Sequence, residues 1–117
     1  MLSIIIPVRN EYENLDEIER QFSTNFSKIH HEVILVNDYS TDDTLLKANE
    51  IKKKNNNFIL FDNKKKGLGG ALNLGIEQSR GEYICIMMAD FSDSIEDLKK
   101  YYQTISASNK DAVFGSR

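Results

Sequence analysis

The stretch that decides the fold reads Tyr83-Ile84-Cys85-Ile86-Met87-Met88-Ala89-Asp90, and Phe91-Ser92-Asp93 follows it. Its first part is a continuous apolar run without polar alternation, which is typical of a strand covered on both faces of a sheet. The run ends on a carboxylate. An acid placed directly after a buried strand indicates a ligand or a cation at that end of the strand.

Four further apolar runs predict strands of the same sheet. They are Ile4–Ile6, Val33–Val36, Phe58–Phe61 and Ala112–Phe114. Segments with apolar residues at helical spacing separate the runs. These residues are Leu15, Ile18 and Phe22, then Leu45, Ala48 and Ile51, then Leu72 and Ile76, and finally Ile95, Leu98, Tyr102 and Ile105. The alternation predicts right-handed crossovers, and so an α/β domain with a mainly parallel sheet and helices on both faces.

Three pairs of residues have the pattern of a helix start, in which a capping side chain stands three residues ahead of an acid. The pairs are Asn14 with Glu17, Ser40 with Asp43, and Ser94 with Asp97. We therefore expect a helix to begin next to the first member of each pair.

A glycine-rich segment, Gly67-Leu68-Gly69-Gly70, follows three lysines and invites comparison with a phosphate-binding loop. A Rossmann fingerprint would need a third glycine where Leu72 stands, and it would follow the first strand. A Walker loop would need Gly-Lys-Ser or Gly-Lys-Thr. We expect instead that these glycines let the third helix start tightly, with Gly75 serving packing and Gly81 a turn.

The composition describes one ordinary domain. The chain has 117 residues, of which 40% are hydrophobic, so residues 1–117 are expected to form a single domain with one core. The formal net charge of -3 gives no basic excess to neutralise phosphates, which excludes nucleic acid as a partner. No apolar stretch approaches the roughly 20 residues that span a bilayer, and no basic-then-apolar leader opens the chain.

The cysteine and the histidines indicate no special chemistry. The single cysteine, Cys85, cannot form an internal disulfide and is expected to be a buried, reduced hydrophobe, which favours a cytoplasmic location. His30 and His31 have no further ligand at zinc spacing and no nucleophile partner for a catalytic triad. We expect both histidines in the loop before the second strand.

Polar residues gather after the predicted strands. In open parallel sheets, ligands bind outside the carboxyl ends of the strands. The candidates are Arg9, Asn10 and Glu11 after the first strand, Asn37 and Asp38 after the second, Asp90, Ser92 and Asp93 after the fourth, and Gly115, Ser116 and Arg117 after the fifth. Such a set suits a nucleotide.

Three of these candidates suit particular parts of a nucleotide. Asp38 would accept hydrogen bonds from a base or ribose, Asp90 suits Mg²⁺ or Mn²⁺ on a diphosphate, and Arg117 would hold a phosphate as a fork. Each also has a purely structural explanation. Asp38 and Asp90 are competent turn or cap residues, and Arg117 is a chain end.

Several motifs taken in order resemble the family 2 glycosyltransferases, and among them the dolichol-phosphate mannosyltransferase-like branch. They are SIIIPVRNEYENL at 3–15, VILVNDYSTDDT at 33–44, GLGGALNLGI at 67–76, GEY at 81–83 and DAVFGSR at 111–117. The resemblance covers nearly the whole chain. It implies a GT-A fold, a Rossmann-like nucleotide-sugar domain, and inverting transfer of a sugar from a nucleoside diphosphate donor.

The resemblance also implies roles for individual residues. The implied nucleotide-sugar-binding set is Pro7, Arg9, Asn10, Glu11, Asp38, Ala89, Asp90 and Arg117. The segment from Pro7 to Glu11 and the acid Asp38 would hold the nucleoside. The acidic motif after the fourth strand would meet the diphosphate and a cation, Mg²⁺ or Mn²⁺, and Arg117 would lie near the phosphates. The resemblance names no catalytic base.

One departure from the family concerns the metal motif. The usual Asp-Ala-Asp stands here as Met88-Ala89-Asp90, and a thioether is a poor ligand for a hard cation. Metal binding would then rest on Asp90, helped by Ser92, Asp93 or donor phosphates. Mg²⁺ often needs only one or two protein carboxylates beside phosphates and water.

A second departure is length, because family members continue well beyond the Gly-Ser-Arg segment. The resemblance therefore implies a truncated chain, the N-terminal donor-binding half of a glycosyltransferase, with weak or absent turnover alone. In the full-length protein, membrane contact would come through the missing C-terminal part, at the cytoplasmic face.

We expect transfer from a donor of the GDP-mannose or UDP-glucose type to a lipid-phosphate acceptor such as polyprenyl phosphate, or to a glycan. The main alternative is a non-catalytic nucleotide-sugar-binding module with a degenerate metal motif, which Met88 favours. A third hypothesis, a phosphoacceptor receiver domain, would need an acidic pair after the first strand, where Arg9 and Asn10 stand.

Overall fold

The computed structural model describes the backbone of residues 1–107 and 113–116 and the side chains of residues 1–90 and 94–105. Within these residues, five strands alternate with four α-helices. The strands are β1 (Leu2–Val8), β2 (His31–Asn37), β3 (Phe58–Asp62), β4 (Tyr83–Met87) and β5 (Val113–Ser116). The helices are α1 (Tyr12–Asn25), α2 (Thr44–Lys54), α3 (Leu68–Gln78) and α4 (Ile95–Ala107), with a 3-10 helix, η1 (Ala89–Ser94), before α4. The predicted order of elements is confirmed.

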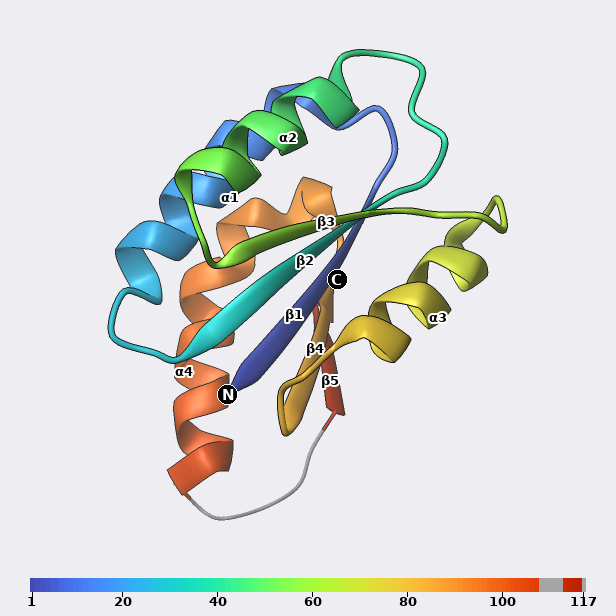
Figure 1. Ribbon diagram of the computed structural model, residues 1–117. Coiled ribbons are helices and arrows are strands. Elements are labelled where there is room, and N and C mark those ends of the chain that lie inside the picture. The colour runs from blue at the N-terminus through green and yellow to red at the C-terminus, as the bar shows by residue number, and fades with distance from the viewer. Residues whose placement is uncertain (108–112, 117) are drawn as a thin grey trace.

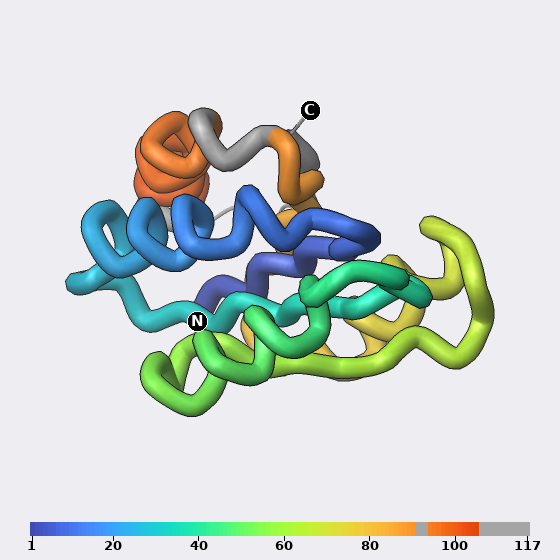
Figure 2. The backbone as a smooth tube through the Cα atoms, turned by 90° about the horizontal axis from the view of Figure 1, so that it is seen from above, coloured from blue at the N-terminus to red at the C-terminus, as the bar shows by residue number. Residues whose placement is uncertain are grey.

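All described strands are parallel and form one sheet in the order β3-β2-β1-β4-β5. The sheet lies between two helical layers: of the described helices, α3 covers one face, and α1, α2 and α4 cover the other (Figure 1). Seen from above, α1 runs between α2 and α4 and contacts both (Figure 2). This is the α/β architecture that the sequence predicts.

Both faces of the central strand are buried, which explains its continuous apolar run. On one face Leu2, Ile4, Ile6 and Val8 pack with apolar side chains of α1, α2 and α4. On the other face Ile5 packs with residues of β2 and with Ala71 of α3. Because successive side chains of a strand point to opposite faces, a strand covered on both sides shows no polar alternation.

Helix α3 lies unusually close to the sheet. A Cβ atom at Gly75 would clash with the side chain of Ile5, so only glycine permits this approach. The helix buries Ala71 and Gly75. The predicted helix at this position is confirmed. Of the two apolar residues that indicated it, Leu72 is half-buried and packs against the core beside Ile5, whereas Ile76 is 44% exposed. Small residues make the closest contact with the sheet.

The predicted helix starts are partly wrong. Helix α1 begins at Tyr12, so Asn14 lies in its first turn and does not cap it. Helix α2 begins at Thr44, whose backbone N–H donates to Asp42 Oδ1 (2.9 Å). The predicted cap Ser40 instead accepts a hydrogen bond from the backbone of the loop after β1 (3.0 Å). Helix α4 begins directly after Ser94, as predicted.

His31 is the first residue of β2, and the prediction of a loop there is wrong. The parallel pairing of β2 with β1 extends to this residue, which is opposite Leu2. Its ring is 8% exposed and lies 5.3 Å from the ring centroid of Phe26 and 6.1 Å from that of Phe22. Burial lowers the pKa of His31, although a hydrogen bond with the carbonyl of Ile29 opposes the shift.

A buried acid lies near the amino ends of β1 and β2. Glu32 is 2% exposed and accepts hydrogen bonds from Ser3 Oγ (2.6 Å), from the backbone N–H of Arg80 (2.8 Å) and from Arg80 Nε (3.0 Å). Ser3 Oγ in turn accepts the backbone N–H of Gly81 (2.8 Å). Burial alone would raise the pKa of Glu32, but these hydrogen bonds and the guanidinium charge lower it below its usual value.

Across residues 1–107 and 113–116, we find no helix that combines the length and the apolar character needed to cross a bilayer.

Candidate functional site

A cavity of about 370 Å³ lies at the carboxyl edge of the sheet, beside the ends of β1, β2 and β4. Six of the predicted site residues line it, namely Pro7, Arg9, Glu11, Asp38, Ala89 and Asp90, together with Val8, Gly67, Leu68 and Met88. These residues come from segments far apart in the sequence. Parallel strands end at one edge, so the loops that follow them meet there.

The other two residues of the predicted nucleotide-sugar-binding set are not among those that line this cavity. Asn10 lines a neighbouring cavity, and Arg117 falls outside the described residues. Asn37 is the last residue of β2, and its side chain Nδ2 donates to Asp62 Oδ1 of β3 (3.0 Å). Asn37 is thus bonded within the sheet, and it does not line the cavity of Asp38.

Asp38 continues the pairing of β2 by one residue, because its backbone N–H donates to the carbonyl of Val8 (2.8 Å). The residue is 6% exposed. Its Oδ1 accepts hydrogen bonds from Asn63 Nδ2 (3.0 Å) and from the backbone N–H of Gly67 (3.0 Å). Oδ2 takes no hydrogen bond from the described residues, and Asp38 lines the cavity.

The glycine-rich segment forms the start of α3. Gly67 has φ +117° at the cap position, a conformation that favours glycine, and its N–H already binds Asp38. A Cβ at Gly70 would clash with the carbonyl oxygen of Lys65. The geometry agrees with the predicted role of these glycines in a tight helix start.

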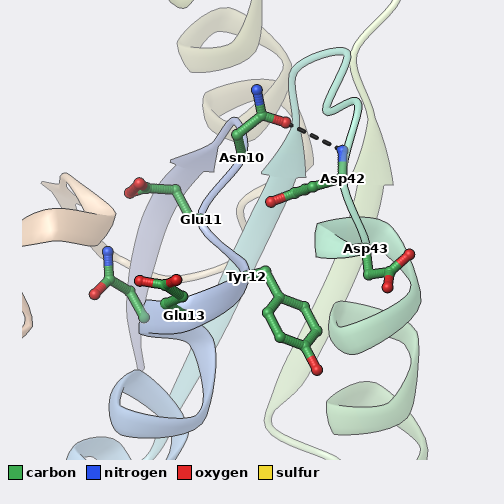
Figure 3. Close-up of a pocket in the computed structure, with 7 residues that line it drawn as sticks. Asn10, Glu11, Tyr12, Glu13, Asp42 and Asp43 are labelled. Carbon is green, nitrogen blue, oxygen red and sulfur yellow. Dashed lines mark hydrogen bonds between the residues drawn. The ribbon is translucent and has the colours of Figure 1, made fainter.

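A second cavity, of about 410 Å³, adjoins the first through Glu11, which lines both. It is lined by Asn10, Glu11, Tyr12, Glu13, Asn14, Asp42 and Asp43 (Figure 3). Asn10 has φ 55°, and its Oδ1 accepts hydrogen bonds from Thr41 N (2.7 Å), Thr41 Oγ1 (3.3 Å) and Asp42 N (3.3 Å). Asn10 therefore joins the loop after β1 to the loop after β2.

The backbone of Glu11 is fixed by the same pair of loops. Its N–H donates to Thr44 Oγ1 (2.9 Å), and Thr44 is fully buried at the start of α2. Figure 3 shows the side chains of Asn10 and Glu11 leaving their loop in different directions. These adjacent residues therefore differ in role. Asn10 joins the loops after β1 and β2, and Glu11 lines the cavity together with Asp38 and Asp90.

The carboxylate of Glu11 is partly buried and lies near two other acids, Asp90 and Asp42. Burial raises the pKa of Glu11, the charge of Asp90 raises it further, and Asp42 adds to the effect, while a hydrogen bond from Asn14 opposes it. Like charges that share a small space destabilise each other. This edge of the sheet is therefore suited to a cation, or to a ligand that donates hydrogen bonds.

The residues present suit a cation held mainly by a bound ligand. Asp90 is exposed in η1, and Met88 lines the cavity where the family would place its first aspartate. In the described part of the chain, no three His, Cys, Asp or Glu side chains gather as a metal site. One carboxylate can still suffice for Mg²⁺ when phosphates and water complete the coordination.

Sequence reasoning missed Gly67 and Leu68, which line the cavity, and Asn63, which does not line it but bonds to Asp38 and Gly67. Asn63 follows β3 directly and is 7% exposed. The rule that selected residues after the other strands would have found it, had it been applied to the third strand as well. Gly67 and Leu68 join the cavity through the hydrogen bond between Gly67 and Asp38, which no sequence pattern reveals.

Comparison with known proteins identifies the family. Residues 3–117 match the model of Glycosyl transferase family 2. The chain belongs to this family. The predicted resemblance and the GT-A fold are confirmed, and the receiver-domain hypothesis is set aside.

Individual relatives share the family and the fold. A dolichol-phosphate mannosyltransferase of Pyrococcus furiosus is 32% identical, and the match covers 99% of this chain and 33% of the relative. The structure of S. aureus TarS 1-349 in complex with UDP-GlcNAc superposes with a TM-score of 0.73 at 27% identity, over 91% of this chain and 31% of TarS.

A third protein, similar in fold, contains a cation in its solved structure. The mannosyltransferase PcManGT of Pyrobaculum calidifontis, in complex with GDP-Man and Mn²⁺, shares the fold with a TM-score of 0.61 at 24% identity, over 76% of this chain and 27% of PcManGT. The chain thus spans about a third of the length of the relatives it matches.

Proposed function

We propose that residues 1–117 are the donor-binding part of an inverting hexosyltransferase. The full-length enzyme would transfer a sugar from a nucleoside-diphosphate donor of the GDP-mannose or UDP-glucose type to an acceptor such as polyprenyl phosphate. One observation carries the proposal: in a family 2 chain, Arg9, Glu11, Asp38 and Asp90 converge on one cavity at the carboxyl edge of the sheet.

In this proposal the nucleoside lies against the loops after β1 and β2. Asp38 offers a carboxylate oxygen, which accepts hydrogen bonds from N–H or O–H groups of a base or ribose. Pro7 and Ala89 supply apolar wall to the same cavity. Arg9 is exposed at the rim and supplies a guanidinium toward an anionic ligand.

Asp90 is the proposed ligand of a Mg²⁺ or Mn²⁺ ion that arrives with the donor diphosphate. Such an ion, when bound, acts as a Lewis acid toward the departing nucleoside diphosphate. Burial and, after it, the charge of Asp90 raise the pKa of Glu11, which fits this placement because two nearby carboxylates repel each other without a cation. The role of Arg117 stays a prediction: its guanidinium would add a positive charge beside the donor phosphates.

The acceptor is proposed from its chemistry. The oxygen of a polyprenyl phosphate is already ionised, so that acceptor needs no catalytic base, whereas a hydroxyl of a glycan would need one. We propose that the acceptor is a lipid phosphate. The domain would then lie in the cytoplasm, at the cytoplasmic face of a membrane. Acceptor binding would then be the task of further parts of the full-length protein.

Calorimetry with UDP, GDP, UDP-glucose and GDP-mannose, with and without Mn²⁺, tests the proposal. We expect binding of one nucleotide family that strengthens with Mn²⁺, and D90A should remove the Mn²⁺ dependence. D97A is a matched control, because Asp97 is an exposed acid in the first turn of α4 that does not line the cavity. A chain that binds none of the four compounds would contradict the proposal.

Met88 favours a second function, a non-catalytic nucleotide-sugar-binding module. Its thioether lines the cavity where a hard cation would prefer a carboxylate. Donor binding that is indifferent to Mn²⁺, both in the wild type and in D90A, would support this module. If M88D then introduces Mn²⁺ dependence, the missing carboxylate is the reason for the loss.

A further inference from the structure

We infer that Asn63 is a positioning residue of the donor site, which holds the Asp38 carboxylate and the amino end of α3 in the arrangement that a nucleotide requires. The inference rests on the proposed function. Asn63 comes directly after β3, and its backbone N–H donates to the carbonyl of Asn37 (2.9 Å), so its place is set by the sheet itself.

The side chain of Asn63 is fully used within the protein. Its Nδ2 donates to Asp38 Oδ1 (3.0 Å), to the carbonyl of Lys65 (2.6 Å) and to the carbonyl of Gly67 (3.3 Å). Its Oδ1 accepts the backbone N–H of Lys65 (3.2 Å). A single amide thus closes the loop between β3 and α3 and attaches that loop to the end of β2.

These bonds fix the orientation of the carboxylate. Asp38 Oδ1 receives both Asn63 Nδ2 and the N–H of Gly67, which matches the two lone pairs of a carboxylate oxygen. The carboxylate cannot rotate without losing one of these bonds. Oδ2 is therefore presented in one direction, as the oxygen left for a ligand in the cavity.

The same amide sets the wall of the cavity. Gly67 and Leu68 line the cavity and open α3, and Gly67 is bonded to both Asn63 and Asp38. The loop carries three consecutive exposed lysines, Lys64 to Lys66, whose charges would otherwise favour an extended, solvated loop. Without Asn63, both the carboxylate and the wall beside it lose their support.

The test compares N63A with N57A. Asn57 comes directly before β3, at the opposite end of the same strand, and its Nδ2 donates to the carbonyl of His31 (2.8 Å). Both substitutions remove an amide that attaches β3 to β2, but only Asn63 bonds to residues that line the cavity, Asp38 and Gly67. N57A is therefore a matched control for loss of stability.

Affinity for UDP and GDP is measured by calorimetry in the presence of Mn²⁺. We expect N63A to reduce the affinity about tenfold for whichever nucleotide the wild type binds, because a hydrogen bond to a charged group is lost. N57A should leave the affinity within about twofold. N63D keeps the side-chain size but replaces the donor with a second carboxylate, so it should weaken binding further. Wild-type affinity in folded N63A would overturn the inference.

A readout without nucleotide separates the inference from the proposed function. Hydrogen exchange at the N–H of Gly67, which donates to Asp38, should be faster in N63A than in N57A or the wild type. A wild type that binds neither nucleotide contradicts the proposed function. Exchange at Gly67 still decides the positioning in that case, since equal rates in N63A and N57A would overturn it.

Discussion

The two edges of the sheet affect their glutamates in opposite ways. Glu32, near the amino edge, is buried and satisfied by Ser3 and Arg80, and its pKa is lowered. At the carboxyl edge, burial raises the pKa of Glu11, and the charges of Asp90 and Asp42 raise it further. The charged form of a glutamate is thus favoured at one edge and disfavoured at the other, and the second edge is the one that we propose for a ligand.

The largest expected effect sharpens this comparison at the amino edge. E32A should lower the free energy of unfolding by about 3 kcal/mol, because it leaves the hydroxyl of Ser3 and the N–H of Arg80 without their charged partner. Nucleotide affinity should not change. Urea denaturation at neutral pH measures the loss, and a change below about 1 kcal/mol would contradict the structural role of Glu32.

The pH dependence of that loss has a definite sign. Because the pKa of Glu32 is lowered by folding, its contribution is present above the ordinary glutamate pKa and disappears as the pH falls through the folded value. The difference between wild type and E32A should therefore shrink in acid. A constant difference over the same range would show that packing, and not charge, carries the effect.

At the carboxyl edge, D38N is expected to act on binding more than on stability. The amide oxygen of the variant can still accept from Asn63 and Gly67, so the fold should stay intact. An N–H group replaces the free acceptor, and affinity for the bound nucleotide should fall at least about tenfold. Calorimetry measures this fall. A variant that binds as the wild type does would remove Asp38 from the site.

The smallest effect is a gain in stability from E11Q. The raised pKa of Glu11 means that its charged form is penalised in the folded state, so a neutral side chain should stabilise the protein at neutral pH by less than about 1 kcal/mol. The gain should vanish in acid, below the ordinary glutamate pKa, where the wild type is protonated as well. A loss of stability at neutral pH would break the comparison between the two edges.

The sequence predicts the sheet well because burial on both faces leaves continuous apolar runs, as in β1 and β2. It predicts the helix starts less well, since the bonds at α2 depend on loops that meet only after folding. Asn10 illustrates this: its amide binds Thr41 and Asp42, whose sequence positions give no sign that they face it.

In the candidate site, too, some features could be predicted from the sequence and others could not. The residues after the strands could be predicted, because the rule for parallel sheets concerns topology and needs no coordinates. The support of Asp38 by Gly67 could not, since it depends on where α3 begins beside the sheet. The close approach of α3 to the sheet is set by Gly75 against Ile5, a contact between segments far apart in the sequence.

The central claim is that a nucleotide binds at the carboxyl edge, and amide NMR spectra recorded during titration with UDP and GDP in the presence of Mg²⁺ test it directly. We expect the largest shift changes at Arg9, Glu11, Asp38, Gly67 and Asp90, with the signals of Ser3, Glu32 and Arg80 unmoved. Changes centred on Glu32 and Arg80, or no changes with either nucleotide, would contradict it.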